Sequence, residues 1–336
     1  MIINGRFITI ILLKWLPLQV SMKIIRYTHT YKEKWDAFVE LSKNGTFLHM
    51  RDYMDYHSDR FDDYSLICVD DKDNILALLP ANRVDDTLYS HQGLTYGGWI
   101  ISIKSVQAST MLEVWNVMNE FLKENGLNRL IYRAVPHIYH RYPAEEDLYA
   151  IFRNGGQIYS SLISTTLPLD ESRLRFNENA RRGMKNAISN GVEVMCSDDW
   201  EQYWDVLSEM LKSQYNTTPV HSLEEIKMLS SRFPNNIKLY VAKCGDEVVA
   251  GTVVFFTHTV AHAQYIAASD KGKQIKALPL VFDYVIQNEC GECRYFDFGT
   301  SNEEGGMYLN EGLIMQKCGM GGRGIAYTTY ELRVES

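Results

Sequence analysis

Four carboxylates lie near a glycine-bearing loop in the last third of the chain, and they could serve in proton transfer. Asp297 lies in the apolar-polar alternation of residues 295–298, and Glu303, Glu304 and Glu311 follow it. A carboxylate within hydrogen-bond reach of an attacking amine can act as a general base. The alternation predicts a strand, and the carboxyl end of a strand in a mixed α/β sheet is a usual place for a ligand. We therefore expect a site in this loop.

Asp297 also has a structural interpretation. A short acidic side chain at the end of a strand often caps the following loop by accepting hydrogen bonds from backbone N–H groups. Alternation places Tyr295 and Asp297 on one face of the strand, so the carboxylate could bond the amides of Thr300 or Ser301. We expect this capping role ahead of a catalytic one, and Asp297 stays a candidate for both.

Lys317 is the main candidate for contact with an anionic group. It follows an apolar helical run and precedes glycines in residues 319–324, where the backbone can approach a phosphate or an oxyanion closely. The alternative is that the helix dipole alone favours a lysine in the last turn of a helix. Gly299, Asn302 and Asn310 are candidates for substrate binding, and the two asparagines are otherwise turn and helix-start residues.

One order of elements occurs twice along the chain and must position these residues. In each half, helical sequence precedes two apolar strands joined by a polar turn, and more sheet, a helix, a strand, a further helix and a last strand follow. The polar turns are residues 70–74 and 244–247. We predict an α/β (α+β) fold of two tandem domains, each a mixed, mostly antiparallel sheet flanked by helices. The expected domains are residues 22–168 and 169–336.

The composition is that of an ordinary two-domain protein. The 336 residues are 46% hydrophobic and 23% charged, which suffices for sizeable cores and lacks the signature of disorder. The net charge of -8 argues against coating nucleic acid by bulk charge, so we expect no DNA partner. Six scattered cysteines favour a reducing compartment, so we expect a cytoplasmic protein. Cys290 and Cys293 have no second pair nearby, and we expect no metal site.

The first 21 residues form a segment of their own. Residues 7–13 are an apolar run that is too short to span a bilayer, for which about 20 apolar residues are needed. The cleavage pattern of a secretory signal is missing as well. We expect residues 1–21 to be an over-called start or a weak apolar segment, without an integral membrane span, and Met22 to be a natural beginning.

Several motifs resemble those of a known family. The closing motif of FemAB-like and BioF2-like acyltransferases resembles the Asp-Phe-Gly-Thr-Ser-Asn of residues 297–302, the helix at 309–317 and the glycines at 319–322. Met320 stands at a position that is aromatic in the family. The basic stretch 179–194 is similar to the family helix that opens the second domain. The order of elements resembles the Gcn5-related N-acetyltransferase (GNAT) fold, occurring twice in tandem over nearly the whole chain.

The resemblance implies acyl transfer to an amine, from either acyl-CoA or, as in the Fem factors, an aminoacyl-tRNA. GNAT enzymes bind the coenzyme pyrophosphate with a Gln/Arg-x-x-Gly-x-Gly/Ala turn at a helix N-terminus. The corresponding stretch here, residues 270–277, has one glycine and three lysines, so charge rather than the motif would hold a coenzyme. The candidates for binding acyl-CoA are Lys271, Gly272, Lys273, Gln274 and Lys276.

We expect an N-acyltransferase that moves an acyl group, acetyl by preference, from acyl-CoA to an amino group of a cell-envelope or polysaccharide precursor. The acceptor would be a small-molecule, glycan or peptide amine. Arg181 and Lys185 lie four residues apart on a helix, where they could bind a phosphate or carboxylate of this acceptor, or tRNA. The catalytic candidates are Lys317, Asp297 and Glu311.

Two other functions stay open. The first is a Fem-type aminoacyl-tRNA-dependent peptidoglycan-bridge aminoacyltransferase. The coiled-coil arm that such proteins often carry has no heptad counterpart in residues 186–233, which favours the thioester donor. The second is a catalytically degenerate GNAT-fold binding module, which the missing pyrophosphate turn would suit. In either case we expect the N-terminal domain to be non-catalytic, because its strand end at residues 132–136 lacks a polar glycine loop.

Overall fold

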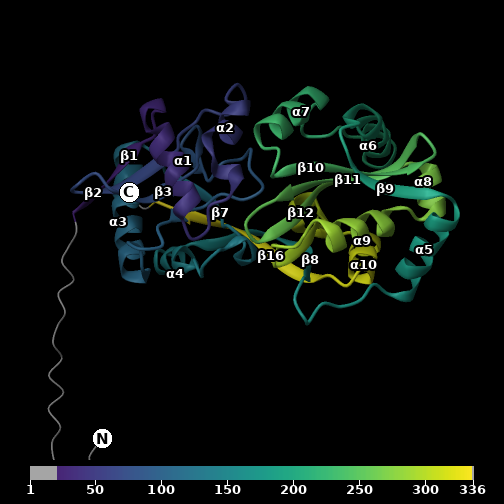
Figure 1. The fold of residues 1–336 in the computed structure, drawn as a ribbon. Coiled ribbons are helices and arrows are strands. Elements are labelled where there is room, and N and C mark those ends of the chain that lie inside the picture. Colours follow the sequence, from purple (N-terminus) through teal and green to yellow (C-terminus); the bar gives the residue numbers. More distant parts are fainter. Residues whose placement is uncertain (1–20, 335–336) are drawn as a thin grey trace, which may run out of the picture.

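The strands and helices form two lobes that lie side by side and share one long sheet (Figure 1). The computed structural model describes residues 21–334, so the N-terminal segment, apart from residue 21, lies outside the described residues. Among the helices of the described part, none combines the length and the apolar composition needed to cross a bilayer.

The N-terminal lobe is built on the hairpin that the sequence predicts. Two apolar strands meet at the polar turn of residues 70–74 and lie inside a four-stranded sheet with the order β1-β2-β3-β6. The elements of this lobe are β1 (Met22–Arg26), α1 (Lys32–Leu41), α2 (Arg51–Met54), β2 (Leu66–Asp70), β3 (Ile75–Leu79), β4 (Asn82–Val84), β5 (Thr87–Tyr89), β6 (Ile100–Ile101), α3 (Ala108–Glu124), β7 (Arg129–Arg133) and α4 (Glu146–Arg153).

The C-terminal lobe places helices on both faces of its sheet, with α6 and α7 on one side and α5 and α9 on the other (Figure 1). From β8 onward the elements are β8 (Gln157–Pro168), α5 (Glu178–Ser189), β9 (Val192–Ser197), α6 (Trp200–Tyr215), α7 (Leu223–Arg232), β10 (Ile237–Cys244), β11 (Glu247–Phe256), β12 (Val260–Ala268), α8 (Asp270–Ile275), α9 (Leu278–Asn288), β13 (Tyr295–Thr300), β14 (Asn302–Glu303), β15 (Tyr308–Leu309), α10 (Glu311–Gly319) and β16 (Arg323–Arg333).

A ten-stranded sheet crosses from one lobe to the other. Its order is β4-β5-β7-β16-β8-β13-β12-β11-β10-β9. The last strand, β16, pairs antiparallel with β8 along most of its length and with β7 of the N-terminal lobe at its end. In Figure 1 this yellow strand runs back into the blue lobe. The end of the chain therefore ties the two lobes together through backbone hydrogen bonds.

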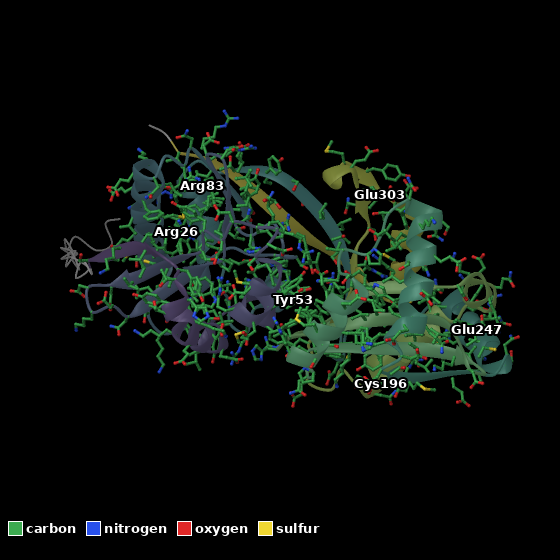
Figure 2. All side chains as sticks on the ribbon, turned by 90° about the horizontal axis from the view of Figure 1, so that it is seen from above. Arg26, Tyr53, Arg83, Cys196, Glu247 and Glu303 are labelled. Atoms are coloured by element: carbon green, nitrogen blue, oxygen red, sulfur yellow. The ribbon has the colours of Figure 1, made fainter. Side chains whose placement is uncertain are left out.

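Apolar side chains from both lobes also form a common core. Phe47 of the N-terminal lobe packs against Phe233 and Phe255 of the C-terminal lobe, with ring centroids 5.5 Å apart in each pair. Tyr53 belongs to the same cluster and lies between the lobes in Figure 2. A second cluster fills the N-terminal lobe beneath α3, and a third lies under α9. Burial of apolar area on this scale gives the lobes a fixed relative position.

Candidate active site

The main cavity of the C-terminal lobe opens where two parallel strands separate. Strands β12 and β13 are paired only from Val260 and Tyr295 to His262 and Asp297. Beyond this point they diverge, and a cavity of about 750 Å³ lies between them, walled also by α6 and α10. Backbone groups that the sheet leaves unpaired face such an opening, so a ligand can take the place of a missing strand.

Asp297 lies at the point of divergence and is fully buried. Its Oδ2 atom is 2.8 Å from Nδ1 of His262 and accepts a hydrogen bond from the Tyr327 hydroxyl at 2.7 Å. Its Oδ1 atom accepts hydrogen bonds from Ser164 at 2.5 Å and from Thr166 at 2.9 Å. The Tyr139 hydroxyl of the N-terminal lobe also donates to Oδ2, at 3.3 Å, so five side chains surround one carboxylate. A buried charge requires such partners, because its hydration is lost.

The environment of Asp297 keeps the carboxylate ionised. Burial alone would raise the pKa of this group, but the hydrogen bond and the charge of His262, together with Ser164 and Tyr327, lower the pKa to about 2. The expected capping of the Thr300 or Ser301 amide is wrong, since the one loop amide bonded to the carboxylate is that of Gly299, at 3.3 Å. The chain turns away at Gly299, whose φ is +78°, before those amides can reach the carboxylate.

His262 is the functional candidate that the sequence interpretation missed. Its side chain is only 12% exposed and lines the cavity. With Nδ1 bonded to Asp297, Nε2 is the ring nitrogen left for a ligand. An imidazole oriented in this way by a carboxylate is a common form of general base. A histidine in an otherwise apolar strand, Val260–Ala268, was the available signal.

Lys317 also lies at the cavity, and within α10 it is the one buried residue. Its ammonium donates hydrogen bonds to the carbonyl oxygens of Gly299 at 2.9 Å and Thr300 at 2.7 Å. An ammonium group has three N–H donors, so one remains for a ligand. Burial lowers the pKa of Lys317 to about 8, although the charge of Asp297 acts in the opposite direction. The structure therefore brings Lys317 and His262 to the cavity, with Asp297 buried behind His262.

Glu311 does not join this group. It lies exposed in the first turn of α10 and is outside the cavity wall. Asn310 lines the cavity, but its side chain caps α10 by accepting a hydrogen bond from the Leu313 amide at 3.0 Å. Asn302 is occupied by the Ile163 amide at 2.7 Å. The hydrogen bonds of both asparagines are therefore those of turn and helix-start residues.

The expected coenzyme-binding stretch forms a short helix, α8, instead of an open turn, and the Ser269 side chain accepts a hydrogen bond from the Gly272 amide in its first turn. Lys271 points to Glu247 at 2.6 Å, and Gly272 packs against the backbone of β11. Gln274 lies outside the main cavity and the hollow beside it. Gly272, Lys273 and Lys276 line this adjoining hollow of about 460 Å³. Three of the five candidates are therefore close to the site.

Arg181 and Lys185 lie on α5, apart from the main cavity. Arg181 lines a separate hollow of about 430 Å³ together with Arg173 and Arg175. Among the ion pairs of the described residues, none involves these three arginines. Lys185 is exposed and does not line this hollow. The two candidates are thus not part of one binding surface with Lys317.

Comparison with known proteins identifies the fold. Residues 175–305 match the family model described as an acetyltransferase (GNAT) domain, and no curated protein matches the chain. The crystal structure of FemX superposes with a TM-score of 0.62 at 12% identity, covering 93% of this chain and 97% of that one. The structure of L-PGS from Bacillus licheniformis gives a TM-score of 0.58 at 15% identity, with coverages of 90% and 92%.

A third similar structure is itself a tandem protein. The tandem GNAT protein from the clavulanic acid biosynthesis pathway superposes with a TM-score of 0.52 at 10% identity, over 94% of this chain and 99% of that one. Identities this low establish a common fold and leave the substrates open. Both lobes are covered in each comparison, and the family model falls on the lobe that carries the cavity. The chain therefore has the FemAB-like fold of two GNAT domains in tandem.

Proposed function

We propose that the protein is an N-acyltransferase that moves an acyl group, acetyl in the simplest case, from acyl-CoA to an amine. The observation that carries the proposal is the Asp297–His262 pair at the point where β12 and β13 diverge. The opening offers backbone groups to an extended donor, and the imidazole faces the same cavity. The proposed acceptor, an amine of a cell-envelope or polysaccharide precursor, rests on the likeness to FemAB-like proteins.

Each residue of the pair has a distinct part in the proposed reaction. Nε2 of His262 accepts a proton from the neutral acceptor amine as the amine nitrogen bonds to the thioester carbonyl carbon. The imidazolium then gives this proton to the sulfur as the carbon–sulfur bond breaks, and the coenzyme leaves as a thiol. Asp297 holds the imidazole in the tautomer with Nδ1–H and stabilises the imidazolium. The free N–H of Lys317 can stabilise negative charge that develops on the carbonyl oxygen.

The first test is binding of the donor. Titration with acetyl-CoA, longer acyl-CoA species and free CoA should raise the midpoint of thermal unfolding in a concentration-dependent way. Replacement of Lys273 and Lys276 by Met should weaken this effect, since both line the hollow that adjoins the cavity. Absence of any shift across the series would overturn the acyl-CoA donor.

The second test addresses the base. His262→Gln should lower kcat by about 10²–10⁴-fold while leaving acetyl-CoA affinity unchanged, because the imidazole acts on the acceptor amine. His258→Gln is the matched control, since His258 is an exposed histidine on the turn before β12. Unchanged turnover in a folded His262 variant would exclude this residue as the base. A similar assay with Lys317→Ala tests whether the lysine contacts the substrate.

A second candidate is an aminoacyl-tRNA-dependent transferase, and the observation that favours it is the arginine group. Arg173, Arg175 and Arg181 surround one hollow without ion-pair partners among the described residues, which suits a phosphate backbone. Charge reversal of all three to Glu should then abolish tRNA binding, and Lys104→Glu on the other lobe should not. Binding that survives the triple change, or no binding at all, would remove this candidate.

A further inference from the structure

The walls of the main cavity restrict the charge of the acceptor. Among the described residues that line it, the charged side chains are Lys273 and Lys317, with His262 as a further basic group, and no carboxylate is present. Asp297 lies behind His262 and is not exposed to the cavity. A polyamine or a strongly basic peptide would bring several positive charges against this wall and be repelled. The acceptor should therefore carry little positive charge beyond its reacting amine.

Three carboxamides take the place of charged groups around the cavity. Gln214 comes from α6, Gln264 from β12 and Gln316 from α10, and none makes a side-chain hydrogen bond with another described residue. Gln214 and Gln316 are exposed at the mouth, where water can satisfy them. A carboxamide has both hydrogen-bond donors and acceptors, and so does a hydroxyl group, so the two groups can pair in either direction.

Gln264 differs from the other two because its Oε1 atom is buried and has no partner. An unsatisfied buried acceptor is costly, and native structures contain few of them. Its backbone position is also irregular, since β11 pairs Val253 with Tyr265 and Val254 with Ala263, leaving Gln264 as the extra residue of a bulge. Bulges often direct a side chain towards a site. The carboxamide oxygen is thus placed to accept a hydrogen bond from a ligand, two residues from His262.

We propose that the acceptor is a polyhydroxylated amine of the amino-sugar class, with a hydroxyl or N–H group bound by Oε1 of Gln264. Gln214 and Gln316 are in place to bind further hydroxyls at the mouth. Tyr215 lines the same mouth and is 46% exposed, so its ring offers an apolar face to the C–H groups of a sugar. This inference rests on the proposed function, because it takes the reacting group to be an amine.

The test compares probes of equal ring size with and without hydroxyl groups. Glucose derivatives with an amino group in place of the hydroxyl at carbon 2, 3, 4 or 6 are compared with cyclohexylamine and spermidine by saturation-transfer NMR. At least one amino sugar should bind at least tenfold more tightly than cyclohexylamine, and spermidine should not bind. Equal or tighter binding of cyclohexylamine or spermidine, or no binding by any of the four sugars, would overturn the inference.

A variant series assigns the binding to Gln264. Gln264→Leu should weaken the best amino sugar at least tenfold, leave cyclohexylamine unchanged and leave the thermal midpoint equal or higher, because a buried acceptor without a partner is removed. Gln107→Leu is the control, since Gln107 is exposed at the start of α3 and far from the cavity. Gln264→Glu serves if the Leu variant does not fold, and it too should weaken binding. Unchanged sugar affinity in a folded variant would refute the role of Gln264.

The two proposals can fail separately. Isothermal titration with acetyl-CoA, carried out on the same preparation, reports the donor alone. Amino-sugar binding without acetyl-CoA binding would overturn the acyl-CoA donor and retain the acceptor class. Acetyl-CoA binding together with equal transfer to cyclohexylamine and the amino sugars would retain the acyltransferase and overturn the acceptor class.

Discussion

At the residue scale, the contacts of Asp297 explain why a buried charge persists beside the cavity. Ionised carboxylates are costly in a protein interior unless hydrogen bonds replace their hydration. His262, Ser164, Thr166 and Tyr327 all contact this carboxylate at 2.5–2.9 Å. These partners orient the carboxylate, and the carboxylate in turn orients the imidazole. Stability and the proposed catalysis therefore depend on the same group.

The first prediction concerns Asp297→Asn. At neutral pH the amide cannot satisfy the same donors, and the free energy of unfolding should fall by about 3 kcal/mol, the scale for breaking a buried charged pair. The folded-state pKa of about 2 lies below the ordinary carboxyl pKa of 3.8, so this stabilisation is present above pH 4 and is lost as the pH falls towards 2. Urea unfolding of the wild type and the Asn variant at pH 7, 4 and 2 should show that the difference between their free energies of unfolding is smaller at pH 2. A difference independent of pH would contradict the ionised state.

The second prediction concerns Lys317→Met and alkaline pH. The folded-state pKa of about 8 is lower than the ordinary lysine pKa of 10.5, so between these values the unfolded chain binds more protons than the folded protein. Stability of the wild type should therefore rise with pH in this window, by up to about 1.4 kcal/mol per unit from this group. The Met variant should lose this part of the rise. Denaturant unfolding at pH 7.5, 8.5 and 9.5 measures the free energy of unfolding of both proteins. The same increase with pH in the wild type and the Met variant would contradict the prediction.

The candidate site could be predicted from the sequence only in part. Asp297 and Lys317 follow from local order, since a strand, a glycine loop and a helix are readable from the chain. The contact between His262 and Asp297 joins residues 35 positions apart and depends on the parallel register of two strands. Nor does sequence spacing show that Tyr139, from the other lobe, lies 2.9 Å from the Tyr327 hydroxyl. Such contacts can be predicted only when the pairing of the strands is known.

At the element scale, α8 occupies the place where an open phosphate-binding turn was expected. Ser269 caps this helix by accepting a hydrogen bond from the Gly272 amide at 3.2 Å, and Lys276 ends it in the left-handed conformation with φ of +57°. Glycine count and charge do not reveal this helix, whereas a serine at the N-cap position is a helix-start signal. Strand β13 and helix α10 were predicted, because their apolar patterns are long enough to be distinctive.

The third prediction tests how closely α8 packs on the sheet. Replacing a glycine inside a helix with alanine normally stabilises the helix by about 1 kcal/mol. At Gly272, however, a Cβ atom would lie 2.0 Å from the Val249 carbonyl oxygen. Gly272→Ala should therefore lower the free energy of unfolding by about 1–3 kcal/mol. Gly291→Ala, with open space around the new Cβ, should change it by less than about 0.5 kcal/mol. Stabilisation of the first variant in denaturant titration would contradict this packing.

At the scale of the whole molecule, the lobes are joined in two independent ways. Strand β16 pairs with strands of both lobes, and the largest apolar cluster contains residues of both. The sequence predicts two tandem domains from a repeated order of elements, but a repeat does not reveal that the last strand returns to the first lobe. That connection depends on long-range pairing, which local patterns do not encode. We infer that the lobes unfold as one cooperative unit.

The fourth prediction tests this inference with Phe47→Ala. Phe47 contacts two aromatic rings of the other lobe, so its loss should lower the free energy of unfolding by about 3–5 kcal/mol. Because backbone pairing through β16 remains, unfolding followed by tryptophan fluorescence and by far-UV circular dichroism should still give one coincident transition, shifted to lower denaturant. The exposed site Phe152→Ala is the control and should shift it little. Two separated transitions in the Phe47 variant would mean that β16 alone does not couple the lobes, and that the shared core provides the cooperativity.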